Sequence, residues 1–200
     1  MPPPASAADR DPGLADLRDR IRLAVDARSL APLVPLMSPT FSYDLSQYSP
    51  AEFLAESKTW SAAQATEFWR DLRDALALPI AAAGDTAYAP YVALVRVPGE
   101  GWRVATARGV KVRLAPSISA PVVAELDYDM VEDVTDYALS RTLPPVRIDG
   151  FSYGWRDIVT PAGTRGWVVE KYVQSPRYMP VIFAKIGGAW KIQGFSVISD

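Results

Sequence analysis

The sequence offers few residues that can do chemistry, because it contains no histidine and no cysteine. Thiolate nucleophiles, imidazole bases and the usual nitrogen and sulfur ligands of transition metals are therefore excluded. Carboxylate pairs, lysine, tyrosine and oxygen-ligand sites for Ca²⁺ or Mg²⁺ remain. The carboxylates near the predicted helices are dispersed and fit exposed faces better than a catalytic pair. They are Asp44, Glu52, Glu56 and Glu67. No catalytic residue, metal site or cofactor is expected.

Aromatic residues in the second half of the chain are the better candidates for a site. A small β-unit cannot bury all of its aromatic side chains, and those left at the surface can line a groove for a peptide or a glycan. Core packing is the competing explanation for each of them. The candidate ligand-binding residues are Tyr128, Tyr153, Trp155, Trp167 and Tyr172.

Acidic residues are also denser in this region than elsewhere in the chain. They would suit a basic partner, although a solvated rim is the simpler explanation. They are Glu125, Asp127, Asp129, Glu132, Asp133 and Asp136. The whole chain has a net charge of −2 with its charges interspersed, which argues against a nucleic-acid partner. No apolar run approaches the ~20 residues of a membrane span.

Amphipathic helices are predicted for the first part of the chain, where they would position these side chains. Apolar residues repeat at helical spacing over 14–28 and over 62–78. Asp11 is the expected N-cap of the first helix, with Pro12 at its first helical position. Ser49 begins a capping box and therefore predicts the start of another helix.

Short strands bounded by turns are predicted from residue 88 onward. A strand at 88–97 is expected to form a hairpin with 102–107, and alternation over 178–198 around Gly187 and Gly188 predicts another hairpin. The strands between these hairpins are typical of a small sandwich or barrel. They cover residues 110–114, 122–126, 130–134, 155–159 and 167–169.

Residues 110–173 resemble a bacterial SH3 domain in the order of their short motifs. The order runs VKVR, APS, VVAEL, WRDI, GTRGWV and YV. Because side chains alternate along a strand, Val110, Val112 and Leu114 are expected to face the barrel core. The resemblance implies a small all-β barrel that binds a cell-wall component or a protein partner.

The segment between residues 137 and 153 is longer than this resemblance accounts for. Loops of more than ~12–15 residues in compact domains are usually functional or disordered. This one carries apolar residues and a stiff Pro144-Pro145 pair. We therefore predict that it folds back as an ordered cover, either over the barrel near Trp155 or against the helical domain.

The flanking regions more loosely resemble the nuclear-transport-factor-like α+β cone. The closing hairpin of that fold carries a G-x-W-K-I…F pattern, which is found here from Gly188 to Phe195. The resemblance implies a cone that can hold an apolar pocket, but core packing is the simpler account of the aromatic residues that would line it. They are Trp60, Phe68, Trp69, Tyr91, Trp190 and Phe195.

These elements together predict an α+β fold. A cone-like domain would comprise residues 13–104 and 177–200, with the C-terminal hairpin completing it. A small all-β SH3-like barrel at 105–176 would be inserted before that hairpin, whereas a rival arrangement assigns the hairpin to the barrel. Residues 1–12 are expected to be a disordered tail because they are rich in Pro, Ala and Ser.

The expected function is that of a non-catalytic bacterial binding or scaffold protein, with peptidoglycan or a protein segment as its partner. One alternative is an enzyme or carrier that uses an apolar pocket of the cone. Another is an assembly protein whose surfaces serve only for interaction. The first residues lack a basic and an apolar signal region, so a periplasmic or secreted location presumes a signal already removed, and a cytosolic location is an open alternative.

Overall fold

The computed structural model describes residues 2–44, 46–176 and 181–195. These residues form an α+β fold with a mixed sheet, an antiparallel sheet and α-helices between their strands. In this described part of the chain, no helix combines the length and the apolar character that a bilayer span requires.

The chain divides into two compact units, each with a hydrophobic core of its own. The helical unit comprises Pro4–Leu94 and Tyr178–Asp200. The strand unit comprises Val95–Arg177 together with Met1–Pro3. The α-helices before residue 94 and the mixed sheet belong to the first unit, and the antiparallel sheet belongs to the second.

The α-helices of the helical unit begin where the sequence places their caps. Asp11 accepts hydrogen bonds from the first turn of α1, and the side chains of Ser49 and Ser61 do the same for the next two helices. Both serines form complete capping boxes, so backbone N–H groups that a helix start leaves unpaired are satisfied. The helices are α1 (Pro12–Asp26), α2 (Pro50–Glu56) and α3 (Ala62–Ala77).

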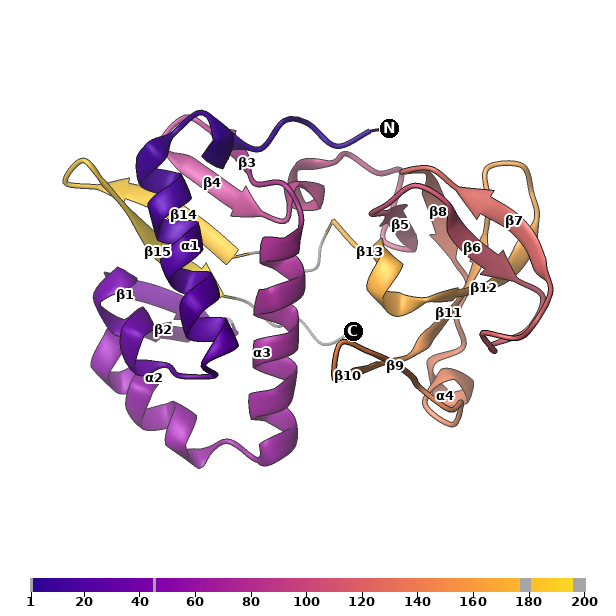
Figure 1. The fold of residues 1–200 in the computed structure, drawn as a ribbon, viewed down its shortest axis with the longest axis horizontal. Helices are drawn as coiled ribbons and strands as arrows, with labels where there is room; N and C mark the ends of the chain where they lie inside the picture. The colour runs from indigo at the N-terminus through magenta and orange to yellow at the C-terminus, as the bar shows by residue number, and fades with distance from the viewer. Residues whose placement is uncertain (1, 45, 177–180, 196–200) are drawn as a thin grey trace. The chain divides into compact units, whose positions relative to one another are not determined.

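A mixed sheet packs against these helices, and α1 crosses its face (Figure 1). Within the described residues the strand order is β2-β1-β15-β14-β4-β3. β15 runs parallel to β1 and antiparallel to β14, which pairs with β4. The prediction that the last hairpin completes the N-terminal part of the fold is confirmed, and the rival assignment is wrong. The strands are β1 (Met37–Tyr43), β2 (Ser46–Tyr48), β3 (Ala81–Ala83), β4 (Thr86–Ala89), β14 (Val181–Ile186) and β15 (Ala189–Phe195).

The last hairpin is tied to the start of α1 by a polar contact. Its turn uses Gly187 and Gly188, whose φ angles of 58° and 82° suit glycine. From β15, the Nε1 of Trp190 donates to Asp11 Oδ2 at 2.9 Å, and from β14, Lys185 Nζ lies 3.1 Å from the same oxygen. Segments that are far apart in the sequence are therefore held together at one carboxylate.

The core of the helical unit lies between the helices and the mixed sheet. Leu14 and Ile21 project from α1, and Phe183 and Ile192 project from the last hairpin, all with no exposed surface. Burying a side chain of this size completely contributes ~1.5–3 kcal/mol, so the hairpin supplies a substantial part of this core.

An antiparallel sheet of short strands forms the strand unit. Its order in the described residues is β13-β5-β8-β11-β12-β6-β7. No ladder joins β7 to β13 among these residues, so the sheet is open rather than the closed barrel that was expected. The strands are β5 (Trp102–Ala105), β6 (Val110–Arg113), β7 (Val122–Leu126), β8 (Met130–Asp133), β11 (Trp155–Val159), β12 (Arg165–Val169) and β13 (Val173–Gln174).

Strand β5 belongs to the strand unit, which corrects the expected hairpin between residues 88–97 and 102–107. It pairs with β8 and β13, so the boundary between the units lies near residue 95 instead of at 105. The segment after β4 forms a short 3₁₀ helix, η4 (Tyr91–Leu94), in place of a longer strand.

A disordered tail was predicted over 1–12, but residues 7–12 are ordered, and Met1 lies outside the described residues. A 3₁₀ turn, η1 (Ala7–Asp9), buries Ala7 and Ala8 in the core of the helical unit. The backbone N–H of Ala7 donates to the C=O of Ile80 at 2.7 Å. A pair of small residues buried in a single 3₁₀ turn has no periodic pattern, and composition alone therefore misses it.

Leu114 does not face the core as the alternation of residues 110–114 predicts, because its side chain is 64% exposed. The register between β6 and β7 shifts between Val112 and Arg113. The extra residue at this bulge is Val123 of β7, and β6 ends at Arg113, so Leu114 lies in the loop beyond the strand and leaves its alternation.

Candidate binding surface

The structure does not bring the five predicted aromatic residues together as an open groove. Tyr153 and Trp155 are 3% and 1% exposed, so they are not accessible to a ligand. Trp167 and Tyr172 are half-buried and pack against the same aromatic cluster. Tyr128 is half-buried in the turn between β7 and β8, where its φ is 60°. Tyr153 and Trp155 therefore serve as packing, whereas Trp167, Tyr172 and Tyr128 each keep part of their surface exposed.

Residues 137–153, here called the cover, fill the place where the groove was expected. The cover contains α4 (Tyr137–Ser140), β9 (Val146–Ile148) and β10 (Phe151–Tyr153). Trp155 Nε1 donates to the C=O of Pro144 at 3.2 Å, and Ser140 Oγ donates to the C=O of Trp155 at 2.9 Å. The prediction of an ordered cover near Trp155 is therefore confirmed.

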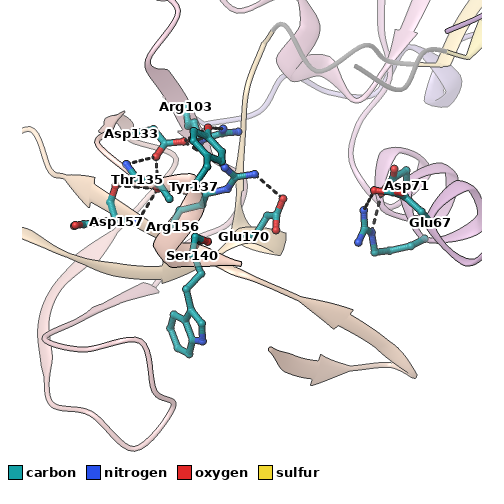
Figure 2. A network of polar contacts seen from close by, with 12 residues as sticks. Glu67, Asp71, Arg103, Asp133, Thr135, Tyr137, Ser140, Arg156, Asp157 and Glu170 are labelled. Atoms are coloured by element: carbon teal, nitrogen blue, oxygen red, sulfur yellow. Dashed lines mark hydrogen bonds and ion pairs between the residues drawn. The ribbon is translucent and has the colours of Figure 1, made fainter. Parts of the chain in front are cut away.

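A buried ionic network holds the start of the cover on the sheet (Figure 2). Arg103 of β5 pairs with Asp133 of β8, and their side chains are only 8% and 4% exposed. The hydroxyl of Tyr137 accepts from Arg103 Nη2 at 3.0 Å and donates to Asp133 Oδ2 at 3.3 Å. The guanidinium of Arg156 lies 4.9 Å from the centre of the Tyr137 ring, within cation–π range. Tyr137 is thus held between two arginines.

The electrostatics of this network indicate a structural role. Burial by itself would raise the pKa of Asp133, but the charge of Arg103 and hydrogen bonds from Thr135 and Arg103 outweigh burial and hold that pKa below its usual range. A general acid needs the opposite shift. Arg156 also donates to Glu170 at 2.8 Å, so opposite charges balance within the network.

The hairpin of β6 and β7 exposes the apolar side chains that the cover does not bury. We call Leu114, Ile118, Val122 and Val123 the apolar edge; they are 64%, 65%, 44% and 38% exposed. The hairpin tip is ordered, because the N–H of Leu114 donates to the C=O of Pro121 at 2.9 Å. The side chain of Arg113 also donates to the C=O of Ala120 at 2.8 Å. Exposed apolar side chains gathered on one element are typical of an interaction surface.

Acidic residues follow the apolar edge along β7. Glu125 forms an ion pair with Lys111 on β6. Asp127 accepts from the N–H of Gly109 at 2.7 Å, and Asp129 accepts from the N–H of Asp127 at 2.8 Å. Within the described residues neither aspartate has an ion-pair partner, so the end of β7 is negatively charged. We call Asp127 and Asp129 the acidic end.

The residues of the helical unit that were candidates for lining a pocket are mostly buried inside it. Trp60 is half-buried and stacks on Tyr43 with ring centres 5.5 Å apart. Burial, with the nearby negative charges, raises the pKa of Tyr43 to about 12. Two of those charges, Glu67 and Asp71 of α3, accept hydrogen bonds from Arg70 (Figure 2). The buried candidates are Phe68, Trp69, Tyr91, Trp190 and Phe195.

Sequence reasoning missed the apolar edge, although two signals point to it. Ile118 stands between two serines in a turn that also holds proline, where a side chain has little core to enter. Val122 and Val123 are consecutive in a strand, and strand geometry sends consecutive side chains to opposite faces. In a regular strand at least one valine of such a pair faces away from the core; here a bulge at Val123 interrupts the strand, and both valines are exposed.

Comparison with known proteins assigns no family to the chain. No protein-family model, no curated protein and no solved structure matches it. The apolar edge, the acidic end and the cover are therefore the features from which a function can be argued.

Proposed function

We propose that the protein is a non-catalytic binding protein that acts outside the bacterial cytoplasm. The strand unit is its recognition module, of the bacterial SH3-like kind that the order of its motifs suggests. The helical unit is a cone-like scaffold. The observation that carries the proposal is the apolar edge, where exposed aliphatic side chains gather on an ordered hairpin.

The apolar edge favours binding because water contact is costly for these side chains. Burying one Leu, Ile or Val completely contributes ~1.5–3 kcal/mol, and a partner that covers the hairpin would recover part of this. Single exposed apolar residues are ordinary on protein surfaces, but Leu114, Ile118, Val122 and Val123 share one hairpin. Four such residues on one hairpin offer a partner more apolar surface than single scattered residues would.

A protein segment suits this surface better than a glycan strand. Aliphatic side chains beside an edge strand complement a peptide, whose backbone can pair with the strand and whose side chains can cover the valines. Two of the aromatic rings that a sugar could stack on are buried: Trp155 lies under the cover, and Tyr153, within the cover, is 3% exposed. We therefore assign a protein or peptide partner, with peptidoglycan as the competing class.

Site-specific crosslinking in a bacterial host tests the proposal. The full-length chain would carry a photoreactive amino acid at Val122 and be exposed to the host's envelope proteins and, separately, to purified peptidoglycan. Leu23 on α1 is 70% exposed and is the matched control position. We expect discrete protein adducts from position 122 only, and we expect Ile118→Glu to remove them.

Other results would contradict the proposal. Adducts of equal strength from both positions would mean that position 122 is not a specific site. Co-sedimentation with peptidoglycan that Ile118→Glu abolishes would replace the protein partner with the cell wall. Recovery of the native protein in the cytosolic fraction of its own cells would overturn the proposed location.

A function as an enzyme or carrier finds no comparable support. Its pocket would be lined by aromatic residues of the helical unit, and these are buried in the core apart from the half-buried Trp60. The binding proposal is preferred for this reason.

A further inference from the structure

We propose that β7 binds an extended protein segment by strand addition, and that the segment carries alternating apolar residues and a basic end that meets Asp127 and Asp129. This inference rests on the proposed function and names the chemistry of its partner. In strand addition, the backbone of a peptide pairs with the free side of an edge strand, while its side chains provide specificity.

Strand β7 has the free side that this mode of binding requires. It lies at the end of the antiparallel sheet, and in the described residues β6 is its strand partner. Residues 121–123 and Glu125 are exposed, and Ala124 is half-buried. The backbone on the far side of the strand is therefore open to another chain.

Within β7 itself, neither of the residues that most often protect an edge strand is present, although the strand is short and bulges at Val123. Proteins commonly place lysine or proline within an edge strand to prevent pairing with other chains. Here the strand reads Val-Val-Ala-Glu-Leu, and its one charge, Glu125, is paired with Lys111. Because the charge is neutralised within the hairpin, it does not repel an incoming strand. An edge strand with exposed valines and no lysine or proline within it leaves its outer backbone for a partner to pair with.

Charge selects the kind of segment that would pair here. The apolar edge lies at the start of β7, and the acidic end follows its last residue. A segment that lies antiparallel to β7 would place its first residues beside Asp127 and Asp129 and its later residues beside Val122. Its N-terminal end should therefore be basic, and apolar residues should alternate along the remainder.

A binding experiment with synthetic peptides tests this inference on the full-length protein. The probe is a labelled peptide, Lys-Lys-Val-Thr-Val-Thr-Val, measured by fluorescence anisotropy. One control peptide has both lysines replaced by glutamate, and another has its alternate backbone nitrogens methylated so that it cannot pair with a strand. We expect saturable binding of the probe, weaker binding as salt increases, and no binding of either control.

A pair of protein variants separates the specific charges from the overall charge. The variant Asp127→Asn with Asp129→Asn should weaken probe binding roughly two- to tenfold, because exposed ion pairs contribute little individually. The variant Asp16→Asn with Asp26→Asn changes the net charge equally on α1 and should bind as the wild type does. Circular dichroism would verify that both variants are folded.

Each contrary outcome has a definite meaning. Equal binding of the methylated peptide would overturn strand addition, and equal weakening by both charge variants would overturn the role of the acidic end. A doubled solution mass that Val122→Lys reduces to that of one chain would assign β7 to a second copy of this protein instead. If probe binding is absent but position 122 still gives specific adducts, this inference fails while the proposed function stands; if the adducts are absent too, both fail.

Discussion

At the scale of single residues, the carboxylate of Asp11 joins three segments of the helical unit. It caps α1 and accepts from Trp190, while Lys185 lies beside it. The hydrogen bond from Trp190, with those from the backbone of Leu14 and from Lys185, lowers the pKa of Asp11 to about 2 from an ordinary value of 3.8. The folded state therefore favours the ionised carboxylate.

This shift predicts how Asp11 contributes to acid stability. A carboxylate whose pKa is lower in the folded state stabilises the fold above its unfolded pKa and loses that effect as pH falls through the folded pKa. The contribution of Asp11 should therefore be complete above about pH 4 and fade toward pH 2. We expect Asp11→Asn to lower the melting temperature at neutral pH and the two proteins to converge near pH 2.

Thermal melts across this pH range would check the prediction. Asp26→Asn changes the same charge at the other end of α1 and serves as the control. A difference between wild type and Asp11→Asn that stays constant from neutral pH to pH 2 would show that the charge of Asp11 is not responsible.

Tyr137 offers a second test at this scale, because its hydroxyl bridges Arg103 and Asp133. Replacing it with phenylalanine keeps the ring against Arg156 but removes both hydrogen bonds, a loss of about 1 kcal/mol. We expect amide hydrogen exchange in residues 138–150 to accelerate about fivefold, with no change in β12. Unchanged exchange in the cover would mean that packing on Trp155 alone holds it.

At the scale of elements, the hairpin of β6 and β7 depends on a close approach to β12. A Cβ added to Gly166 would lie 2.7 Å from the C=O oxygen of Arg113 and 2.8 Å from Val112 Cγ1. Neither atom can move freely, because one belongs to a strand backbone and the other to a fully buried side chain. Only glycine fits where these strands meet.

Gly166→Ala should accordingly destabilise the strand unit. Overpacking of this kind typically costs ~1–3 kcal/mol. Gly99→Ala is the matched control, because an added Cβ there would lie 3.8 Å from the nearest atom, an ordinary contact. Urea denaturation followed by tryptophan fluorescence should show a lower midpoint for the first variant only, and equal midpoints would contradict the close approach.

The sequence predicts elements well where their signals are local. The side chains of Asp11 and Ser49 cap the helices that follow them, so these residues predict the helix starts. Gly187-Gly188 likewise predicts a turn. The exposure of Leu114 was not predictable in this way, because it depends on β6 ending at Arg113, one residue before the predicted end of the strand. The burial of Trp155 depends on a segment that folds back over it; the apolar residues of 137–153 predicted such a cover, but they did not decide between Trp155 and the helical domain as its place.

At the scale of the whole molecule, the two units should differ in their ability to fold as separate fragments. The strand unit is nearly continuous in sequence, whereas the helical unit takes two strands of its sheet from beyond residue 180. The sequence predicted this insertion from the pattern of the last hairpin. It placed the boundary too late, because the pairing of β5 with β8 and β13 is not local.

Separate expression of fragments would test this difference. We expect residues 95–177 to unfold cooperatively on their own and residues 4–94 to be unfolded, because β1 and β4 lose the strands that join them. Fusing residues 178–200 to the end of the second fragment through a flexible linker should restore cooperative melting. A cooperative transition in 4–94 alone would show that the last hairpin is dispensable.

The position of β14 and β15 at the centre of the mixed sheet has a consequence for how the protein is made. A ribosome synthesises β1 roughly 140 residues before it synthesises β14, a delay of about 7–28 seconds at ~5–20 residues per second. During that delay the early helices and strands of the helical unit have an exposed apolar face. The strand unit, whose residues are synthesised before β14, can fold in the meantime. We expect chaperones that bind exposed apolar surface to bind such a nascent chain. Premature termination of translation would release the chain with that face uncovered.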